Sequence, residues 1–311
     1  MTKSSTPTKP VVVQIGEVTL GGNRGEYPTT LILSTFHSRD RIVSNHKLGH
    51  FDKRRATRYL NRAMNLSQTT GNPLILDVLA ETPKAMVTYL TYLSEVAESV
   101  PFLIDSSSSA ARQAGIQYIQ EIGRADLAIY DAITHHTSDE ELQALQAAKI
   151  QSAIILAHNP LDIRPRGRLE VLLGTPEEPG LIAKAEKAQI TKLLIDTVAL
   201  DLAGLSLAAT AMRLVKQELG FPVGAGSANS VALWNRSSRI SPAAKRYLAP
   251  ALCTYLQCHG ANFILAGPLR RAPRFFSTVA VTDALLSYSA PDGSYPAPTP
   301  KSKQHPRYTI M

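Results

Sequence analysis

The sequence predicts a single (β/α)₈ barrel, a fold in which eight parallel strands alternate with helices around a closed sheet. Two observations support this prediction. Short runs of Ile, Val and Leu, apolar on both faces, recur eight times along the 311 residues, as expected for strands that are buried on both sides. Helical patterns with start and stop residues separate these runs. Eight alternations of strand and helix are the number that closes a barrel.

The eight predicted strands are rich in branched apolar residues, and a polar residue follows most of them closely. They cover 30–35, 74–79, 102–106, 127–132, 152–157, 193–198, 222–226 and 262–267. An open, doubly wound sheet is the alternative to a barrel. Its phosphate-binding fingerprint, G-x-G-x-x-G after the first strand, is absent from the chain. The barrel is therefore the preferred prediction.

Capping residues mark the helices between the strands. Side chains that favour the N-cap position begin several of them: Asp52, for a helix to about Thr70; Thr82, followed by Pro83; and Ser138, in a capping box with Glu141. Glycines that favour a left-handed conformation end others: Gly71, Gly220 and Gly260. These residue types at these places are typical of helix ends.

Three parts of the chain are predicted. Residues 1–29 form an N-terminal segment whose β-hairpin, over 11–20, caps the bottom of the barrel. Residues 30–288 form the barrel itself. Residues 289–311 form a tail rich in Pro, Ser and Lys that lies over the surface or is mobile. One long connection, 158–179, joins the fifth strand to its helix, and in a barrel such a loop lies on the catalytic face.

Composition and charge exclude several classes of protein. No apolar run reaches the roughly 18 residues of a membrane span, and the first ten residues lack a signal-peptide core. We therefore expect a cytoplasmic protein without membrane insertion. The net charge is +8, with basic clusters at 53–55, 164–168 and 270–274. No nucleic-acid-binding motif accompanies the charge, so we expect no nucleic-acid partner. An acidic partner protein, an anionic ligand or plain solvated charge remain open.

Cysteines and histidines do not form a recognisable metal or nucleophile site. Cys253 and Cys258 fall in a predicted helix, where a disulfide would be strained. With the adjacent His259 they still lack the four ligands of a structural zinc. We interpret them as structural residues and expect no bound metal. The pair at 135–136 is interpreted as solvated, and His158, at the end of strand five, is the one candidate site histidine.

Polar residues follow the predicted strands, at the end of the barrel where such enzymes bind ligands. They are Asp77 and Glu81, Asp105 and Ser106, Asp131, His158 and Asn159, Asp196, and Asn229. Each alone could be a helix cap. Together they suit a ligand rich in N–H donors, such as a heterocycle with amino and lactam groups. Gly224 and Gly226 let the backbone approach this pocket ahead of Asn229.

Taken in order, these motifs form a larger pattern from Gly16 to Asp283. Its pieces are Gly21-Gly22 with Gly25-Glu26-Tyr27-Pro28-Thr29, Lys47-x-Gly49-x-Phe51-Asp52-Lys53, Leu76-Asp77-Val78 with Glu81-Thr82-Pro83, Phe102 to Ser106, Ala128-Ile-Tyr130, Ala153 to Ala157 with Asn159-Pro160, Ile195-Asp196-Thr197, and Gly220 to Gly226 leading to Asn229. The pattern resembles the MtrH family, the methyltransferase component of tetrahydromethanopterin S-methyltransferase, together with its bacterial methyltransferase relatives.

The resemblance implies a pterin-binding barrel, similar to dihydropteroate synthase, in one-carbon metabolism related to methanogenesis. Its expected reaction moves a methyl group between a methylcobamide and the ring nitrogen of tetrahydrofolate or tetrahydromethanopterin. It implies that Asn229 and Asp196 are the catalytic residues. The implied pterin-binding residues are Asp77, Glu81, Asp105, Ser106, Asp131, Asn159, Asp196, Gly224, Gly226 and Asn229. Asp131 stands where the related methyltetrahydrofolate enzymes have asparagine, and the residues around Asn229 also depart from the usual pattern.

The corrinoid is expected on a separate partner protein. The corrinoid motif D-x-H-x-x-G is absent, since Ser44 precedes His46-x-x-Gly49 where aspartate is needed. The resemblance also implies a homodimer, and peripheral association with a membrane complex stays open. Two alternatives remain. One is a dihydropteroate-synthase-like condensation, for which the strand-five arginines are the sole clear anion site. The other is a non-catalytic assembly component that keeps the barrel without the chemistry.

Overall fold

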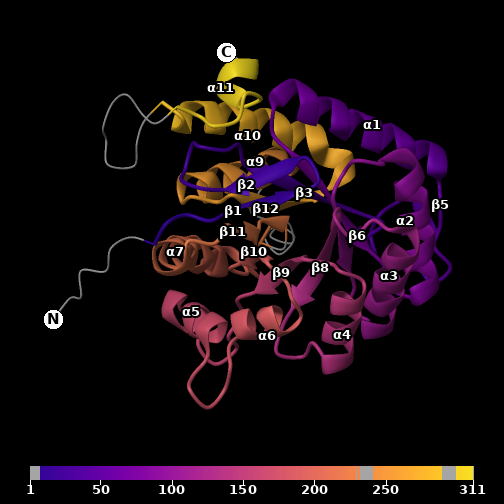
Figure 1. Ribbon diagram of the computed structural model, residues 1–311. Coiled ribbons are helices and arrows are strands. Elements are labelled where there is room, and N and C mark those ends of the chain that lie inside the picture. The colour runs from indigo at the N-terminus through magenta and orange to yellow at the C-terminus, as the bar shows by residue number, and fades with distance from the viewer. Residues whose placement is uncertain (1–7, 229, 232–240, 289–298, 311) are drawn as a thin grey trace.

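A computed structural model describes residues 8–228, 230–231, 241–288 and 299–310. Eight parallel strands close a barrel in the order β10-β11-β12-β3-β6-β7-β8-β9, and helices surround it (Figure 1). The strands are β3 (Thr30–Thr35), β6 (Leu74–Leu79), β7 (Phe102–Asp105), β8 (Ala128–Ile133), β9 (Ser152–Leu156), β10 (Lys192–Asp196), β11 (Val223–Gly226) and β12 (Phe263–Pro268). Each agrees with a predicted strand to within two residues, so the predicted barrel is confirmed.

The helices begin and end largely where the capping residues predicted. They are α1 (Lys53–Thr70), α2 (Pro83–Val96), α3 (Ser109–Ile122), α4 (Asp139–Ala147), α5 (Pro165–Leu173), α6 (Leu181–Lys187), α7 (Leu202–Leu219), α9 (Pro242–Cys258), η1 (Leu269–Arg271), α10 (Ala272–Leu286) and α11 (Pro306–Thr309). The Asp52 carboxylate accepts a hydrogen bond from Arg55 N at 2.9 Å. Gly71 and Gly220 adopt left-handed conformations, with φ of 79° and 74°. The predicted caps of α1 and α7 are thus confirmed.

The predicted capping box at the start of α4 forms only in part. Ser138 Oγ accepts a hydrogen bond from Glu141 N at 3.3 Å. The Glu141 carboxylate does not accept the hydrogen bond from the Ser138 backbone N–H that a capping box requires, because it is buried and pairs with Arg112 and Tyr130. A buried carboxylate gains more from a cation and a hydroxyl than from one backbone N–H. This half of the prediction is therefore wrong.

The connection between β9 and α6 is not a continuous loop, as the sequence suggested. It contains α5, which begins at Pro165 with no side-chain cap from Arg164. A nine-residue helix without a capping side chain gives a weak sequence signal. The remaining loop residues, before and after α5, still follow strand β9 at the mouth of the barrel.

A hairpin of β1 (Val12–Ile15) and β2 (Val18–Gly21) closes the bottom of the barrel. Its apolar side chains pack with residues from the first halves of seven barrel strands. This buried cluster comprises Val13, Ile15, Val18 and Leu20 with Ile32, Ile75, Leu103, Ile129, Ile154, Leu194 and Phe263. Gly21 has a φ of 114°, and a Cβ there would lie 2.2 Å from Val11 O, so the pairing requires glycine.

Two further segments lie outside the barrel strands. A small hairpin of β4 (Val43–Asn45) and β5 (His50–Phe51) precedes α1. The described end of the chain returns to the barrel, where α11 packs against α10 and α1 (Figure 1). Among the described helices, none has the length and apolar character that a membrane crossing requires. Cys253 and Cys258 lie in α9 as free thiols, which agrees with their predicted structural role.

A candidate site of buried carboxyls at the barrel mouth

Three aspartates from neighbouring strands meet at the C-terminal end of the barrel. Asp77 belongs to β6, Asp105 ends β7, and Asp131 lies in β8 directly beside Asp105 in the strand register. Carboxyl oxygens from all three lie within 4.8 Å of one another. Parallel strands about 4.8 Å apart bring their end residues together in this way. The predicted convergence of these three side chains is therefore present in the structure.

Burial and mutual repulsion disfavour the simultaneous ionisation of all three carboxyls. Burial, followed by the charges of Asp105 and Asp131, raises the pKa of Asp77 well above its usual range. Burial, then the charges of Asp105 and Asp196, does the same for the pKa of Asp131. Burial also raises the pKa of Asp105, to about 6. Asp77 and Asp131 thus bind their protons more tightly than Asp105 does.

Asp196 brings a fourth carboxyl to the mouth, at the end of β10. It is 8% exposed, and burial raises its pKa to about 6, opposed by Val198 N–H and by Arg168. The Val198 N–H donates to Asp196 Oδ1 at 2.7 Å. Asp196 is therefore ionised at neutral pH. The mouth thus holds carboxyls of different proton affinity side by side. A carboxyl donates a hydrogen bond when it is protonated and accepts one when it is ionised.

Arg168 holds the loop after β10 in place. Its guanidinium is buried, donates to Ile163 O at 2.9 Å and to Val198 O at 2.6 Å, and also contacts Thr197 O. These bonds tie the β9 and β10 loops together next to Asp196. Sequence reasoning missed this role, because Arg168 was one of several arginines in a basic cluster. Only its burial distinguishes it from its exposed neighbours.

A second buried arginine supports the ends of β7 and β8. Arg112 pairs with Glu141 through Nε–Oε1 at 2.9 Å and Nη2–Oε2 at 3.1 Å. Tyr130 donates its hydroxyl to Glu141 Oε1 at 2.8 Å, and Arg112 Nη1 donates to Ser106 O. Tyr130 precedes Asp131 in the chain, and Ser106 follows Asp105, so this network fixes both strand ends. The sequence had predicted Glu141 only as a member of the capping box of α4, and not as part of this network.

Some of the other predicted site residues form hydrogen bonds with the backbone of their own loops. Ser106 Oγ donates to Ala80 O at 2.6 Å and accepts from Ser108 N at 3.0 Å. Asn159 Oδ1 accepts from the backbone N–H of Leu161 and of Asp162, as in an Asx turn. Glu81 is exposed and lies outside the three-carboxyl cluster. Their direct contact with a ligand stays a prediction.

The glycine and histidine candidates differ in how closely other atoms surround them. A Cβ on Gly224 would lie 2.3 Å from Phe263 O, so glycine is needed there for strand packing. Around Gly226 the nearest atom to a Cβ is Leu265 Cβ at 4.0 Å, which leaves room for a ligand. His158 is half-buried, and the pair at 135–136 is exposed as predicted. Asn229, the predicted catalytic amide, lies outside the described residues.

Solved structures with the same architecture are dihydropteroate synthases. The enzyme of Yersinia pestis in a sulfonamide drug complex has a TM-score of 0.61 at 15% identity, covering 90% of this chain and 100% of that one. The enzyme of Xanthomonas albilineans with 4-aminobenzoic acid has a TM-score of 0.59 at 17% identity, covering 89% and 98%. At these identities the likeness concerns the fold alone. Fold and mouth define an acid-lined (β/α)₈ barrel of the dihydropteroate synthase type.

Sequence comparison gives the family. The family model described as "Tetrahydromethanopterin S-methyltransferase MtrH subunit" matches residues 8–294. The MtrH protein of Methanosarcina acetivorans is 34% identical over 291 residues, 91% of this chain and 92% of that protein. The MtrH protein of Methanothermobacter thermautotrophicus is 32% identical over 311 residues, 97% of each. The chain belongs to this family of methyltransferase subunits, which confirms the resemblance found in the strand-end motifs.

Proposed function

We propose that this chain transfers a methyl group between a methylcobamide on a corrinoid-carrying partner protein and a ring nitrogen of a reduced pterin. The pterin is tetrahydromethanopterin or tetrahydrofolate. The family supports the reaction class. The observation that carries the assignment to this site is the convergence of three carboxyls at the barrel mouth, where burial raises the pKa of each.

The carboxyls match the hydrogen-bonding edge of a pterin. A pterin ring presents amino and lactam N–H donors next to carbonyl and ring-nitrogen acceptors. Ionised Asp105 and Asp196 suit the donors, and protonated Asp77 suits an acceptor. Asp131 replaces the asparagine of related enzymes, but in its protonated form it still offers one donor and one acceptor. The replacement therefore keeps the hydrogen-bonding pattern of the amide.

Methyl transfer from cobalt to nitrogen is a displacement that needs no covalent bond to the protein. The chain's task is to bind the pterin, orient its nitrogen toward the mouth and hold a polar environment around it. In this proposal Asp196 fixes the ring from the β10 side, and Asn229 lies beside the reacting nitrogen. An amide both donates and accepts, so it can serve that nitrogen with and without its methyl group.

The partner is proposed to dock over the mouth. Three aliphatic side chains on the loops after the neighbouring strands β9 and β10 are strongly exposed: Leu161 at 97%, Ile163 at 52% and Leu200 at 54%. Exposed apolar side chains at the entrance of a site suit contact with another protein. A homodimer, which the family resemblance implies, and a cytoplasmic location, which the sequence led us to expect, belong to the same proposal.

Methyl transfer can be measured with the purified chain, excess free methylcobalamin and each of the two reduced pterins. Appearance of cob(I)alamin in the absorbance spectrum reports the reaction. We expect turnover that depends on the protein and falls sharply in Asp105→Ala. Quenching of pterin fluorescence reports binding separately. A chain that binds neither pterin would contradict the proposal and favour the non-catalytic assembly alternative. Formation of a dihydropteroate from 4-aminobenzoate and a hydroxymethyl-dihydropterin pyrophosphate, with release of pyrophosphate, would favour the condensation alternative.

A further inference from the structure

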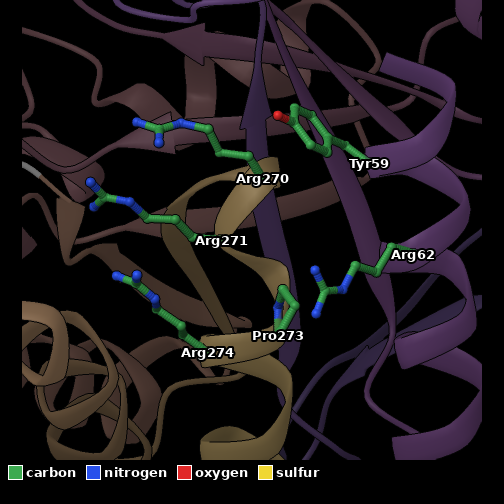
Figure 2. A pocket seen from close by; sticks show the side chains of 6 residues that line it. All are labelled: Tyr59, Arg62, Arg270, Arg271, Pro273 and Arg274. Carbon is green, nitrogen blue, oxygen red and sulfur yellow. The ribbon is translucent and has the colours of Figure 1, made fainter. Parts of the chain in front are cut away.

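A cavity lies between α1 and the start of α10, beside the turn that follows β12. It has a volume of about 410 Å³ and is lined by Tyr59, Arg62, Arg270, Arg271, Pro273 and Arg274. Figure 2 shows that Arg270, Arg271 and Arg274 extend to the same side of the turn between β12 and α10. Arg62 reaches from α1 toward Pro273 (Figure 2). Four of the six lining residues are thus arginines. In Figure 2 the side chains of Arg270, Arg271 and Arg274 extend away from Tyr59 and Arg62.

The positive charge of this cavity has no counter-charge in the described part of the chain. No described carboxylate lies within 4 Å of the four guanidiniums. Burial, followed by repulsion from Arg270 and Arg274, lowers the pKa of Arg271. Helix α1 adds Lys53, Arg54 and Arg58 and contains no acid, while its Arg55 pairs with Asp52 just before the helix. Like charges gathered without compensation favour the binding of an anion.

His37 adds an unused donor beside these arginines. It follows β3, and its Nδ1 accepts a hydrogen bond from Arg39 N at 3.1 Å, so Nε2 carries the hydrogen of the neutral ring. This Nε2 is buried and has no hydrogen-bond partner among the described residues. Burial lowers the pKa of His37; Asp40 opposes the shift, while Arg270, His46 and Arg271 add to it. A buried N–H without an acceptor is costly unless a ligand supplies one.

The cavity adjoins the mouth of the barrel. Pro268, at the end of β12, pairs with Ser34 of β3, and Ser34 pairs with Asp77 of β6. Two strand spacings therefore separate the backbones of Pro268 and Asp77, about 10 Å. Arg270 and Arg271 follow Pro268 within three residues. One elongated molecule can thus contact the mouth aspartates and the arginines together.

We propose that the arginine cavity binds the anionic end of the pterin substrate whose ring lies among the mouth aspartates. This inference rests on the proposed function and names the substrate class, a reduced pterin that ends in carboxylate or phosphate groups. Guanidinium groups offer paired donors that match such oxyanions. Tyr59 and Pro273 supply a flat apolar side to the same cavity.

Calorimetry on the full-length chain tests the inference with three probes. Inorganic pyrophosphate reports the anion site alone, tetrahydrofolate carries a ring and an acidic end, and 6-methyltetrahydropterin carries the ring alone. The variant is Arg270→Gln/Arg271→Gln. The matched control is Arg213→Gln/Arg246→Gln, which removes the same charge from exposed positions on α7 and α9. Arg62→Gln alters the cavity from α1 and leaves the turn after β12 intact.

We expect the cavity variant to bind pyrophosphate and tetrahydrofolate about tenfold or more weakly, as for the loss of charge-assisted hydrogen bonds. Its affinity for 6-methyltetrahydropterin should match that of the wild type. Arg62→Gln should weaken the same two probes, and the control variant should change none of the three.

Three results would overturn the inference in different ways. Unchanged pyrophosphate binding in both cavity variants would mean that no anion site exists here. Weaker pyrophosphate binding with unchanged tetrahydrofolate binding would assign the anion to another source, such as acidic side chains of the partner. Absence of binding of either pterin to the wild type would refute the proposed function, and the substrate assignment with it. The pyrophosphate titration would then still report whether the arginines bind an anion.

Discussion

Asp105 and Asp131 are register partners on the neighbouring strands β7 and β8, and their carboxyls meet at the barrel mouth. Asp105 has a pKa of about 6, whereas burial, followed by the charges of Asp105 and Asp196, raises the pKa of Asp131 well above its usual range. Two identical side chains in neighbouring positions thus differ in how readily they ionise. Environment, and not residue type, separates their roles.

The protonation of Asp131 predicts which substitutions the site tolerates. Asp131→Asn should bind the pterin within about threefold of the wild type, because the amide keeps one donor and one acceptor. Asp131→Ala should lose about tenfold or more, because a buried partner group is left unpaired. Fluorescence quenching titrations at pH 7 measure both affinities. An Asn variant as weak as the Ala variant would show that Asp131 acts as a carboxylate.

Asp105→Ala and Asp196→Ala should each weaken pterin binding by roughly 1.5–3 kcal/mol, since each removes a charged acceptor from a pterin N–H group. Both carboxyls have a pKa near 6, so wild-type affinity should also fall as the pH drops below 6. Calorimetry at pH 5 and pH 7.5 measures both effects. Unchanged affinity in both variants, with the fold intact, would remove these residues from the site.

The buried carboxyls should make the fold less stable as pH rises. Asp105 and Asp196 have a pKa of about 6 in the folded chain, against about 3.9 when unfolded. The folded state therefore binds more protons between these values, and the free energy of unfolding falls with rising pH. The pKa of Asp77 is raised further, so Asp77→Asn should be more stable than the wild type at pH 8.

Urea unfolding at pH 4, 6 and 8 measures this trend. The advantage of Asp77→Asn should be small at pH 4 and grow with pH. Asp126→Asn serves as the control, since Asp126 is exposed, and its unfolding curves should follow the wild type throughout. A wild-type chain whose stability rises from pH 4 to pH 8 would contradict the predicted protonation of the mouth.

Glu141 should be important for stability although it contacts no ligand in the proposed complex. Glu141→Ala leaves Arg112 without its carboxylate in a largely buried position, which should cost about 3–5 kcal/mol. The adjacent, exposed Glu140 provides the matched control, Glu140→Ala, with an expected change of under about 0.5 kcal/mol. Equal denaturation midpoints for the two variants would argue against this role of the Arg112 network.

Asn229 is predicted to act in catalysis from the family pattern. Asn229→Asp keeps a residue that can cap a helix but cannot donate when ionised. We expect the methyl-transfer rate to fall about tenfold or more, equivalent to about 1.4 kcal/mol of barrier per factor of ten. Cob(I)alamin appearance with a methylated corrinoid partner and tetrahydrofolate measures it. Turnover at the wild-type rate would reduce Asn229 to a cap.

Much of this architecture is encoded locally. The apolar pattern of a strand buried on both faces lies within a few consecutive residues. A helix cap such as Asp52 before α1 or Gly220 after α7 likewise depends on nearby residues, so these positions could be predicted. The convergence of Asp77, Asp105 and Asp131 was predictable too, because parallel strands end at one edge. Once the eight strands are placed, the residues at their C-terminal ends are known to form the mouth.

The supporting contacts could not be predicted in the same way. Arg112 and Glu141 are 29 residues apart, and only the packing of α3 against α4 brings them together. Arg168 differs from Arg164 and Arg166 in burial alone. The protonation of Asp131 depends on charges from two other strands. Such features depend on tertiary packing, and no local pattern records them.

The hairpin of β1 and β2 gives the barrel a floor. With Leu20 and its neighbours filling the lower end, we expect the pterin to enter the barrel from the mouth. The pterin and the partner protein would then both approach the site through the barrel mouth. In the proposed reaction, a docked partner would hold the pterin inside until the partner departs. The order of binding would be compulsory, with the pterin first and the partner second. Initial-rate kinetics would then follow an ordered mechanism.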